Sequence, residues 1–386
     1  MAILSRTARG RTRLATSWLL AGSAVATLTG AAPASAASIP AVQPLVFDSP
    51  GWRALPQSDR QLFTQFAHVS TTFDGHAAGV WSPSFRPDRM ARVVGALPEG
   101  AGPGTRPRYA YAIGHPDPAK LGAATPVDLP RELGLPAVHR ISDGPALDKL
   151  RDLPFYEVDD AAVVHFNYGT GASFDPGTWL LSRIDVHEAF HHFQSTFRPA
   201  VPGQPNPRDF PRGPAAVHAL ALLEDRVLAA PGPARERLRT FLAIRATRYA
   251  QVPAVVDLER QQDQWEGTAR FAEDRYVELG GQTVVHEDRT PEDRRGLFFH
   301  LAGNRSYAVG AAIGRLLEQS TGESWRGLIA EGNAPADAAA KLVGTPEGAE
   351  RERLIEEAKG RHDYPGLLAR ITAADLPGLN LDEPKR

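Results

Sequence analysis

Hydrophobic and polar residues change their spacing along the chain near residue 180. Before that point, short apolar runs alternate with Gly, Pro and Asp, and examples are residues 77–81, 109–113 and 162–166. Apolar runs of this length between turn-forming residues are typical of β-strands. We therefore expect residues 37–180 to form a mixed α/β lobe built around a small sheet.

Beyond residue 180, apolar residues recur at helical spacing over longer segments. The predicted helices cover residues 184–197, 215–230, 234–251, 255–279, 307–319 and 347–359. Pro or Gly follows most of them, which is where helices usually end. The last one is rich in Arg and Glu, so we expect it on the surface. Residues 181–386 are thus predicted to form a mainly helical lobe, and the whole chain an α+β fold.

The first 36 residues have the pattern of a secretory signal peptide. Four arginines lie within residues 6–13, an apolar stretch covers residues 14–32, and residues 34–36 read Ala-Ser-Ala, as at a signal-peptidase site. A membrane anchor is the alternative, but Ser, Thr and Gly dilute the apolar stretch. We therefore expect a secreted, extracytoplasmic protein that begins near Ala37 and keeps no stable membrane anchor.

Composition narrows the possible chemistry. The chain has no cysteine, which excludes disulfides, thiolate metal sites and cysteine nucleophiles, so His, Asp or Glu must hold any metal. Its 43 basic and 45 acidic side chains give a net charge of −2. This balance argues against a nucleic-acid partner, because nucleic-acid-binding proteins usually carry a basic excess. The oligomeric state has no signal in the sequence.

The strongest chemical signal lies in the predicted helix 184–197. His187, Glu188 and His191 form the pattern H-E-x-x-H. Residues four apart lie on one face of a helix, so both imidazoles can reach one ion, and zinc accepts such nitrogens. Glu188 lies beside that line, where it can take a proton from a metal-bound water. The motif therefore predicts a Zn²⁺ site with Glu188 as general base.

A catalytic zinc site usually has three protein ligands, so one more is needed. The candidates are Glu224 and Glu266, each in a predicted helix. We favour Glu266, because its neighbours are apolar and aromatic and a carboxylate buried among them needs a partner. The adjacent Gly267 weakens a helix, which makes sense if this helix approaches the His187 helix closely. Glu224 remains the alternative.

The H-E-x-x-H helix, together with the downstream Glu266-Gly267-x-Ala269-x-Phe271, resembles the gluzincin metallopeptidases. In many of these enzymes the third ligand stands in an E-G-x-A-x-aromatic helix. The resemblance covers about residues 162–319. It implies a zincin-like fold, with a small sheet lobe, the motif helix beneath it and zinc in the cleft between two lobes. It also implies that residues 163–168 form an edge strand that pairs with an extended substrate.

The resemblance further implies a donor for the oxyanion that forms during hydrolysis. Related enzymes often carry a tyrosine at the start of a helix that follows the third ligand, and Tyr307 fits that position. Tyr276 and His300 are the alternatives.

Together these features predict a secreted zinc-dependent peptidase that acts on a peptide or protein substrate through a zinc-activated water. A zinc hydrolase of a non-peptide amide or ester is one alternative. A non-catalytic exported binding protein on the same scaffold is another, although it would leave Glu188 without a task, because Glu188 is not a predicted ligand.

Overall fold

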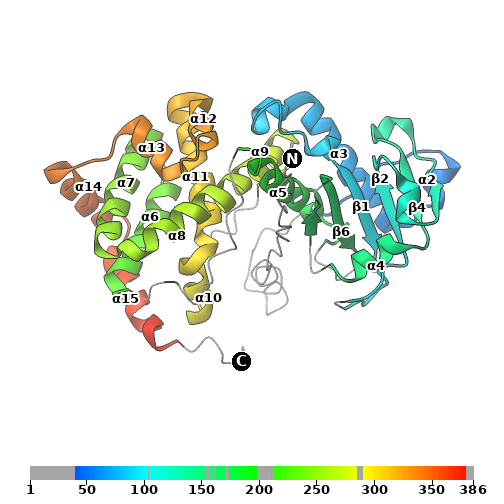
Figure 1. Cartoon of the computed structure of the whole chain (residues 1–386). Helices are drawn as coiled ribbons and strands as arrows, with labels where there is room; N and C mark the ends of the chain where they lie inside the picture. The colour runs from blue at the N-terminus through cyan, green and yellow to red at the C-terminus, as the bar shows by residue number, and fades with distance from the viewer. Residues whose placement is uncertain are drawn as a thin grey trace, which may run out of the picture.

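A computed structural model describes residues 40–102, 104–153, 156–159, 161–169, 174–197, 210, 213–284 and 290–379. The predicted signal peptide lies outside the described residues. The fold is α+β, with a sheet at one end of the molecule and a helical body at the other (Figure 1). Helices α3, α5 and α9 lie between these two parts. No helix in the described ranges is long and apolar enough to cross a bilayer.

The sheet has six strands in the order β3-β4-β2-β1-β6-β5. Their bounds are β1 (Ala91–Ala96), β2 (Tyr109–Ile113), β3 (Ala124–Pro126), β4 (Val138–Ile141), β5 (Tyr156–Val158) and β6 (Val163–Tyr168). The β1–β6 pair is parallel and the other pairs are antiparallel. Side chains alternate between the two faces, so one face packs on α3 and the other on α4 (Pro145–Arg151).

The expectation that residues 163–168 form the edge of the sheet is wrong. They do form a strand, β6, but β5 lies outside it and pairs with it antiparallel from Val158↔Val164 to Tyr156↔Phe166. The backbone groups of β6 over this stretch are therefore already used. An extended substrate cannot add to β6 there without displacing β5.

The expectation of a strand at residues 77–81 is also wrong. Ala77–Val80 is the last turn of α3 (Gln57–Val80), a helix that is kinked at His76 and lies inside the lobe that we expected to be rich in strands. Its buried residues Leu62, Phe66, Val69 and Phe73 recur three or four positions apart, which is the helical period. A five-residue apolar run cannot by itself distinguish a strand from the end of such a helix.

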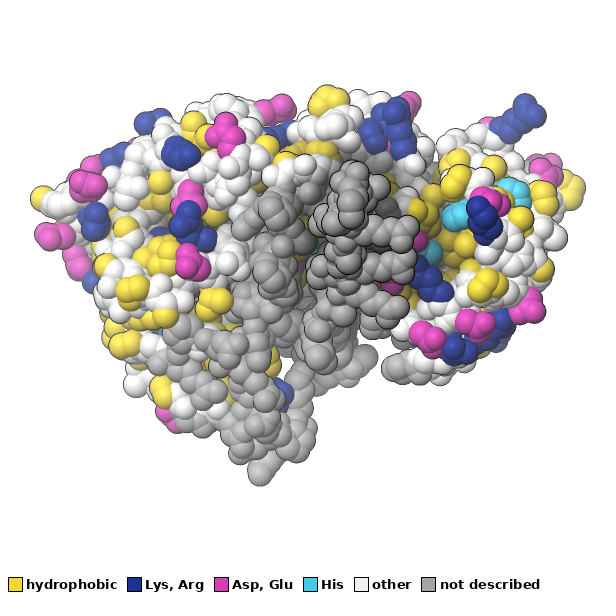
Figure 2. Space-filling view, in the orientation of Figure 1, with side chains coloured by type: hydrophobic (Ala, Val, Ile, Leu, Met, Phe, Trp, Pro, Cys, Tyr) yellow, Lys and Arg dark blue, Asp and Glu magenta, His cyan; other side chains and the backbone are white. Residues whose placement is uncertain are grey.

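The helical body matches the predicted segments closely. The corresponding helices are α5 (Leu180–Gln194), α6 (Ala215–Ala229), α7 (Ala234–Gln251), α8 (Val256–Gln262), α9 (Thr268–Leu279), α11 (Arg305–Thr321) and α14 (Gly348–Arg361). The structure also has α-helices that the sequence analysis did not predict: α2 (Pro50–Ala54), α10 (Arg294–Phe299), α12 (Trp325–Ala330), α13 (Pro335–Val343) and α15 (Tyr364–Ala374). On the face shown in Figure 2, acidic and basic side chains are interspersed over this body, in keeping with the nearly neutral net charge.

Helix α3 contributes to two hydrophobic cores. Its first half places Leu62, Phe63 and Phe66 in the core beneath the sheet. Its second half places Phe73 and Val80 in the core of the helical body. The sheet and the helices are therefore joined through one continuous element.

A buried carboxylate ties the start of α3 to the sheet. Asp59 is fully buried and accepts hydrogen bonds from the hydroxyls of Tyr109 (2.8 Å), Tyr111 (2.6 Å) and Tyr168 (2.9 Å). Burial, together with this carboxylate, raises the pKa of Tyr109 to about 12. The three phenols thus remain protonated donors, and one side chain of α3 connects strands β2 and β6.

We expect Asp59→Ala to lower the free energy of unfolding by roughly 2–4 kcal/mol, because it leaves buried hydroxyls without their charged acceptor. Urea denaturation followed by circular dichroism measures the change. Tyr109→Phe removes one donor at a partly exposed position and should cost less. A loss below about 0.5 kcal/mol for Asp59→Ala, which is the size of an ordinary surface effect, would contradict this role.

Candidate metal centre

Helix α5 carries His187, Glu188 and His191, all of them buried. An ion pair holds the helix against the sheet: Nη2 of Arg92 on β1 lies 2.7 Å from Oδ2 of Asp185, and both side chains are buried. Because Asp185 is two residues before His187, this pair fixes the part of α5 that presents the motif.

Glu266 comes from an irregular turn between α8 and α9. Residues Asp263–Gly267 are π-helical, a conformation that is rare and often found at functional sites. Gly267 permits a close helix contact, but the partner differs from the one we expected. A Cβ on Gly267 would lie 2.6 Å from Cα of Gly310, so the close approach is to α11 and not to the His187 helix.

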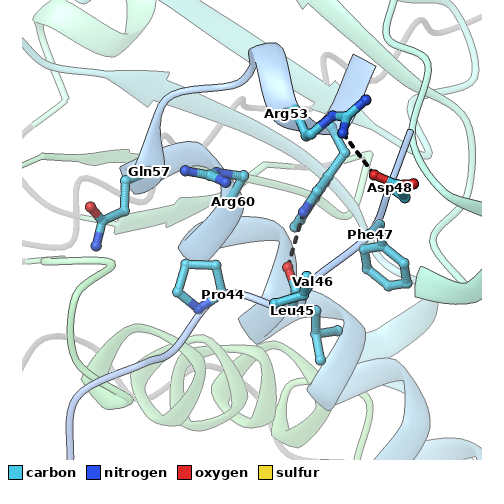
Figure 3. A pocket seen from close by; sticks show the side chains of 9 residues that line it. Pro44, Leu45, Val46, Phe47, Asp48, Arg53, Gln57 and Arg60 are labelled. Atoms are coloured by element: carbon cyan, nitrogen blue, oxygen red, sulfur yellow. Dashed lines mark hydrogen bonds and ion pairs between the residues drawn. The ribbon is translucent and has the colours of Figure 1, made fainter. Parts of the chain in front are cut away.

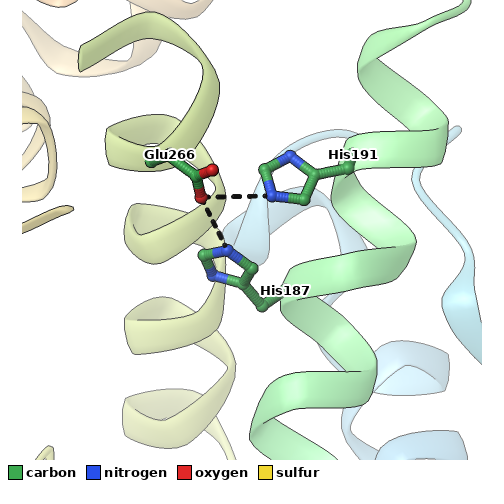
Figure 4. Close-up of side chains that lie close together, drawn as sticks. All are labelled: His187, His191 and Glu266. Atoms are coloured by element: carbon green, nitrogen blue, oxygen red, sulfur yellow. Dashed lines mark hydrogen bonds and ion pairs between the residues drawn. The ribbon is translucent and has the colours of Figure 1, made fainter. Parts of the chain in front are cut away.

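The three predicted ligands lie together between α5 and this π-helical turn (Figure 4). Nε2 of His187 and Nε2 of His191 each lie 3.3 Å from Oε2 of Glu266. Ligands bonded to one tetrahedral zinc at roughly 2.0–2.1 Å are about 3.3–3.4 Å apart. Both distances to Glu266 therefore fit a single zinc ion, and all three ligand atoms lie within 4.8 Å of one another.

Gln194 determines which nitrogen of His191 carries the proton. Its amide nitrogen donates to the carbonyls of Gln264 and Trp265 and to the hydroxyl of Thr268. Its amide oxygen is therefore the atom 2.8 Å from Nδ1 of His191, so Nδ1 must be the donor in that bond. The lone pair of His191 is then on Nε2, which faces Glu266.

Glu273 faces the other ring nitrogen of His187. Its Oε2 lies 3.3 Å from Nδ1 of His187, a contact without hydrogen-bond geometry, while its Oε1 accepts from Arg183 at 2.9 Å. Nε2 of His187 is hydrogen-bonded to Glu266, and a metal ion would take the place of the proton in that bond. Metal-ligating histidines commonly have a carboxylate or carbonyl at their other ring nitrogen.

When both imidazoles are neutral and each carries its proton on Nδ1, two Nε2 lone pairs converge on the Glu266 carboxylate. Nε2 of His191 is buried and has no hydrogen bond of acceptable geometry within the described ranges. Burial opposes protonation of His187, but the carboxylates of Glu266 and Glu273 outweigh it and raise its pKa to about 10. The site therefore attracts a cation, and a metal ion would satisfy all three atoms at once, whereas a proton on His187 would satisfy only part of the group.

Glu188 differs from the other acidic residues of the site. It is buried but forms no ion pair or side-chain hydrogen bond with any described residue. Burial raises its pKa above the ordinary value, and the charges of His191 and His187 offset part of this effect. A carboxylate with a raised pKa and no partner, next to a cation site, is suited to accept and return a proton.

Tyr307, the residue predicted as oxyanion donor, lies beside the predicted ligands. Its ring stacks on that of His187, with centroids 5.7 Å apart, and its hydroxyl hydrogen-bonds to Glu266. Burial and the charge of Glu266 raise the pKa of the phenol well above its usual range, so it stays a donor. The alternatives are engaged elsewhere, because Tyr276 bonds His68 (2.8 Å) and His300 pairs with Asp225 (3.1 Å).

Glu224, the alternative third ligand, belongs to a separate buried cluster. Its carboxylate lies 2.8 Å from Nε of Arg248, 2.9 Å from Nη2 of Arg305 and 3.1 Å from Nη2 of Arg245. Burial alone would raise the pKa of Glu224, but the three guanidinium groups hold it well below its usual range. Arginines therefore occupy the position that a metal ion would need.

Sequence reasoning missed Gln194, Glu273 and Arg183. The spacing offered a partial signal, because Gln194 follows His191 by three residues and Glu273 follows Glu266 by seven, so each lies near the same face of its helix as the ligand before it.

Two pockets open on the sheet lobe, and neither is lined by His187, His191 or Glu266. Comparison with protein-family models, curated proteins and solved structures finds no match to this chain.

Proposed function

We propose that the protein is an exported zinc-dependent peptidase. The observation that carries the proposal is the convergence of two Nε2 atoms and the Glu266 carboxylate beside the unpaired, buried Glu188. Two imidazole nitrogens and one carboxylate, with a fourth coordination position left open, are typical ligands of a catalytic zinc ion. The unpaired Glu188 favours catalysis over a purely structural ion, because a structural site has no use for it.

His187, His191 and Glu266 would hold the zinc. When bound, zinc supplies Lewis-acid chemistry, in that it lowers the pKa of water and polarises a carbonyl. Glu188 would take the proton from the attacking water and deliver it to the leaving amine, which its raised pKa supports. Tyr307 would donate its hydroxyl hydrogen to the oxygen on which negative charge develops.

A peptide substrate is supported by the resemblance of the two motifs to gluzincins and by the signal-like first 36 residues. Pairing of the substrate with β6 along Val164–Phe166 is not part of the proposal, because β5 already occupies that side. The substrate would instead be held by groups nearer to α5 and the π-helical turn.

The test uses protein purified from culture fluid, whose first residue, near Ala37, is checked by N-terminal sequencing. We expect it to contain about one zinc per chain and to cleave members of a mixed peptide library. A chelator should abolish cleavage and added zinc should restore it. Cleavage of small esters or non-peptide amides, with no peptide cleaved, would assign the same centre to another hydrolase class. Zinc-free protein with undiminished peptidase activity would refute the proposal.

A further inference from the structure

We propose that a pocket on the sheet lobe binds a small carboxylate with an apolar substituent, such as the C-terminal residue of a peptide. The pocket lies between the extended segment 44–48 and the start of α3, and Trp52 of α2 also lines it (Figure 3). None of its lining residues belongs to the metal centre. The proposal therefore does not rest on the proposed peptidase function.

The cationic group of the pocket is Arg60. Its guanidinium forms no ion pair or side-chain hydrogen bond with any described residue, and its Nε is buried without a partner. In Figure 3 it extends towards Gln57, and no marked interaction reaches it. A guanidinium is always charged, and because protein covers Nε of Arg60, the two Nη groups are the donors that an incoming anion would reach.

The second arginine of the pocket is already neutralised. Nη1 of Arg53 lies 2.7 Å from Oδ1 of Asp48, and both side chains are largely exposed. Asp48 is the acidic residue among those that line the pocket, so its charge is used by Arg53 and not by Arg60. The pocket thus keeps one unpaired positive charge. Gln57, three residues before Arg60 and on the same side of α3, adds an amide donor.

The opposite wall is apolar and exposed. Leu45 is 43% exposed and Val46 is 94% exposed, and they are the exposed large hydrophobic residues of the described chain. Beneath them the rings of Phe47 and Trp52 pack edge to face, 5.4 Å apart. The backbone carbonyl of Leu45 accepts from Nε1 of Trp52 at 3.0 Å, which fixes this wall against α2.

An unpaired guanidinium facing an apolar wall selects a ligand with both features. Arginine binds a carboxylate through two parallel N–H groups, which suits the terminal group of a peptide or a free acid. The apolar wall would cover the side chain next to that carboxylate. A phosphate or sulfate would satisfy Arg60 but would leave Leu45 and Val46 uncovered.

The test compares N-acetyl-L-leucine with N-acetyl-L-leucinamide, which has the same shape without the charge, by titration calorimetry on the mature protein. We expect the acid to bind at least about tenfold more tightly than the amide. Arg60→Gln should weaken binding of the acid roughly 10- to 100-fold, because it removes a charge-assisted hydrogen bond. Hexanoate tests whether the natural ligand is a free apolar acid or a peptide C-terminus. If hexanoate binds as tightly as N-acetyl-L-leucine, the pocket accepts apolar acids in general. If hexanoate binds more weakly, the pocket prefers a peptide C-terminus.

The double substitution Arg53→Gln with Asp48→Asn is the matched control, because it removes the neighbouring ion pair and leaves the net charge of the pocket unchanged. It should change the affinity by less than about threefold. Val46→Asp, at a position too exposed to affect folding, should also weaken binding by opposing the charge of the acid. Circular dichroism checks that each variant is folded. Equal affinity for acid and amide, no detectable binding of the acid, or full binding by Arg60→Gln would overturn the proposal.

Discussion

Glu188→Gln is expected to lower peptide turnover by roughly 10²- to 10⁴-fold while the protein keeps its zinc. The substitution preserves size and helix propensity but removes the group that accepts the proton. Because Glu188 is not one of the three converging ligands, the metal should stay bound. The measurement is the rate of peptide cleavage, taken together with zinc content on the same sample.

The matched control is Glu352→Gln, the same change at an exposed position of α14, which should leave both quantities unaltered. Should Glu188→Gln keep full activity, the hydrolytic role of the centre would be refuted. Loss of zinc in this variant would instead show that Glu188 is itself a ligand.

Substitutions around the centre should give a graded loss of zinc affinity. His187→Ala, His191→Ala and Glu266→Gln each remove a direct ligand and should weaken zinc binding by more than 10²-fold. Glu273→Gln leaves the ligands in place but removes the carboxylate that orients His187, so we expect a loss of roughly 10- to 100-fold. Competition titration against a chromophoric zinc chelator measures each value.

Glu224→Gln provides the control for this series, because its carboxylate faces three arginines and not the histidines. It should lower stability but leave zinc affinity unchanged. The reverse result, with zinc lost by Glu224→Gln and retained by Glu266→Gln, would show that Glu224 is the third ligand and would contradict our proposal.

The bounds of helices and strands were predicted correctly where Pro or other terminating residues flank the segment. Helix α7 has the predicted bounds 234–251, because Pro233 precedes it and Pro253 follows shortly after it. Strand β2 likewise has the predicted bounds 109–113. The juxtaposition of Glu266 with the two histidines was also predicted, because the motif required a third ligand and Glu266 stands among apolar and aromatic neighbours.

Features set by tertiary contacts were not predictable in the same way. Strand β5 has three residues, too few to show a period, so nothing in the sequence indicated that β6 would be covered. The π-helical turn at residues 263–267 differs from an α-helix only in its hydrogen bonding, and an apolar pattern does not record that difference. The role of Gln194 depends on carbonyls more than 60 positions away.

The change of residue pattern near position 180 does not coincide with a boundary between independent folding units. Trp81, at the end of α3, packs against Phe190 (4.8 Å between ring centroids), Trp325 (5.5 Å) and Phe271 (6.0 Å). A fragment that began at residue 181 would expose this aromatic surface to water and lose the partner that fills it. The helices that carry the candidate metal ligands thus depend for their packing on a segment encoded a hundred residues earlier.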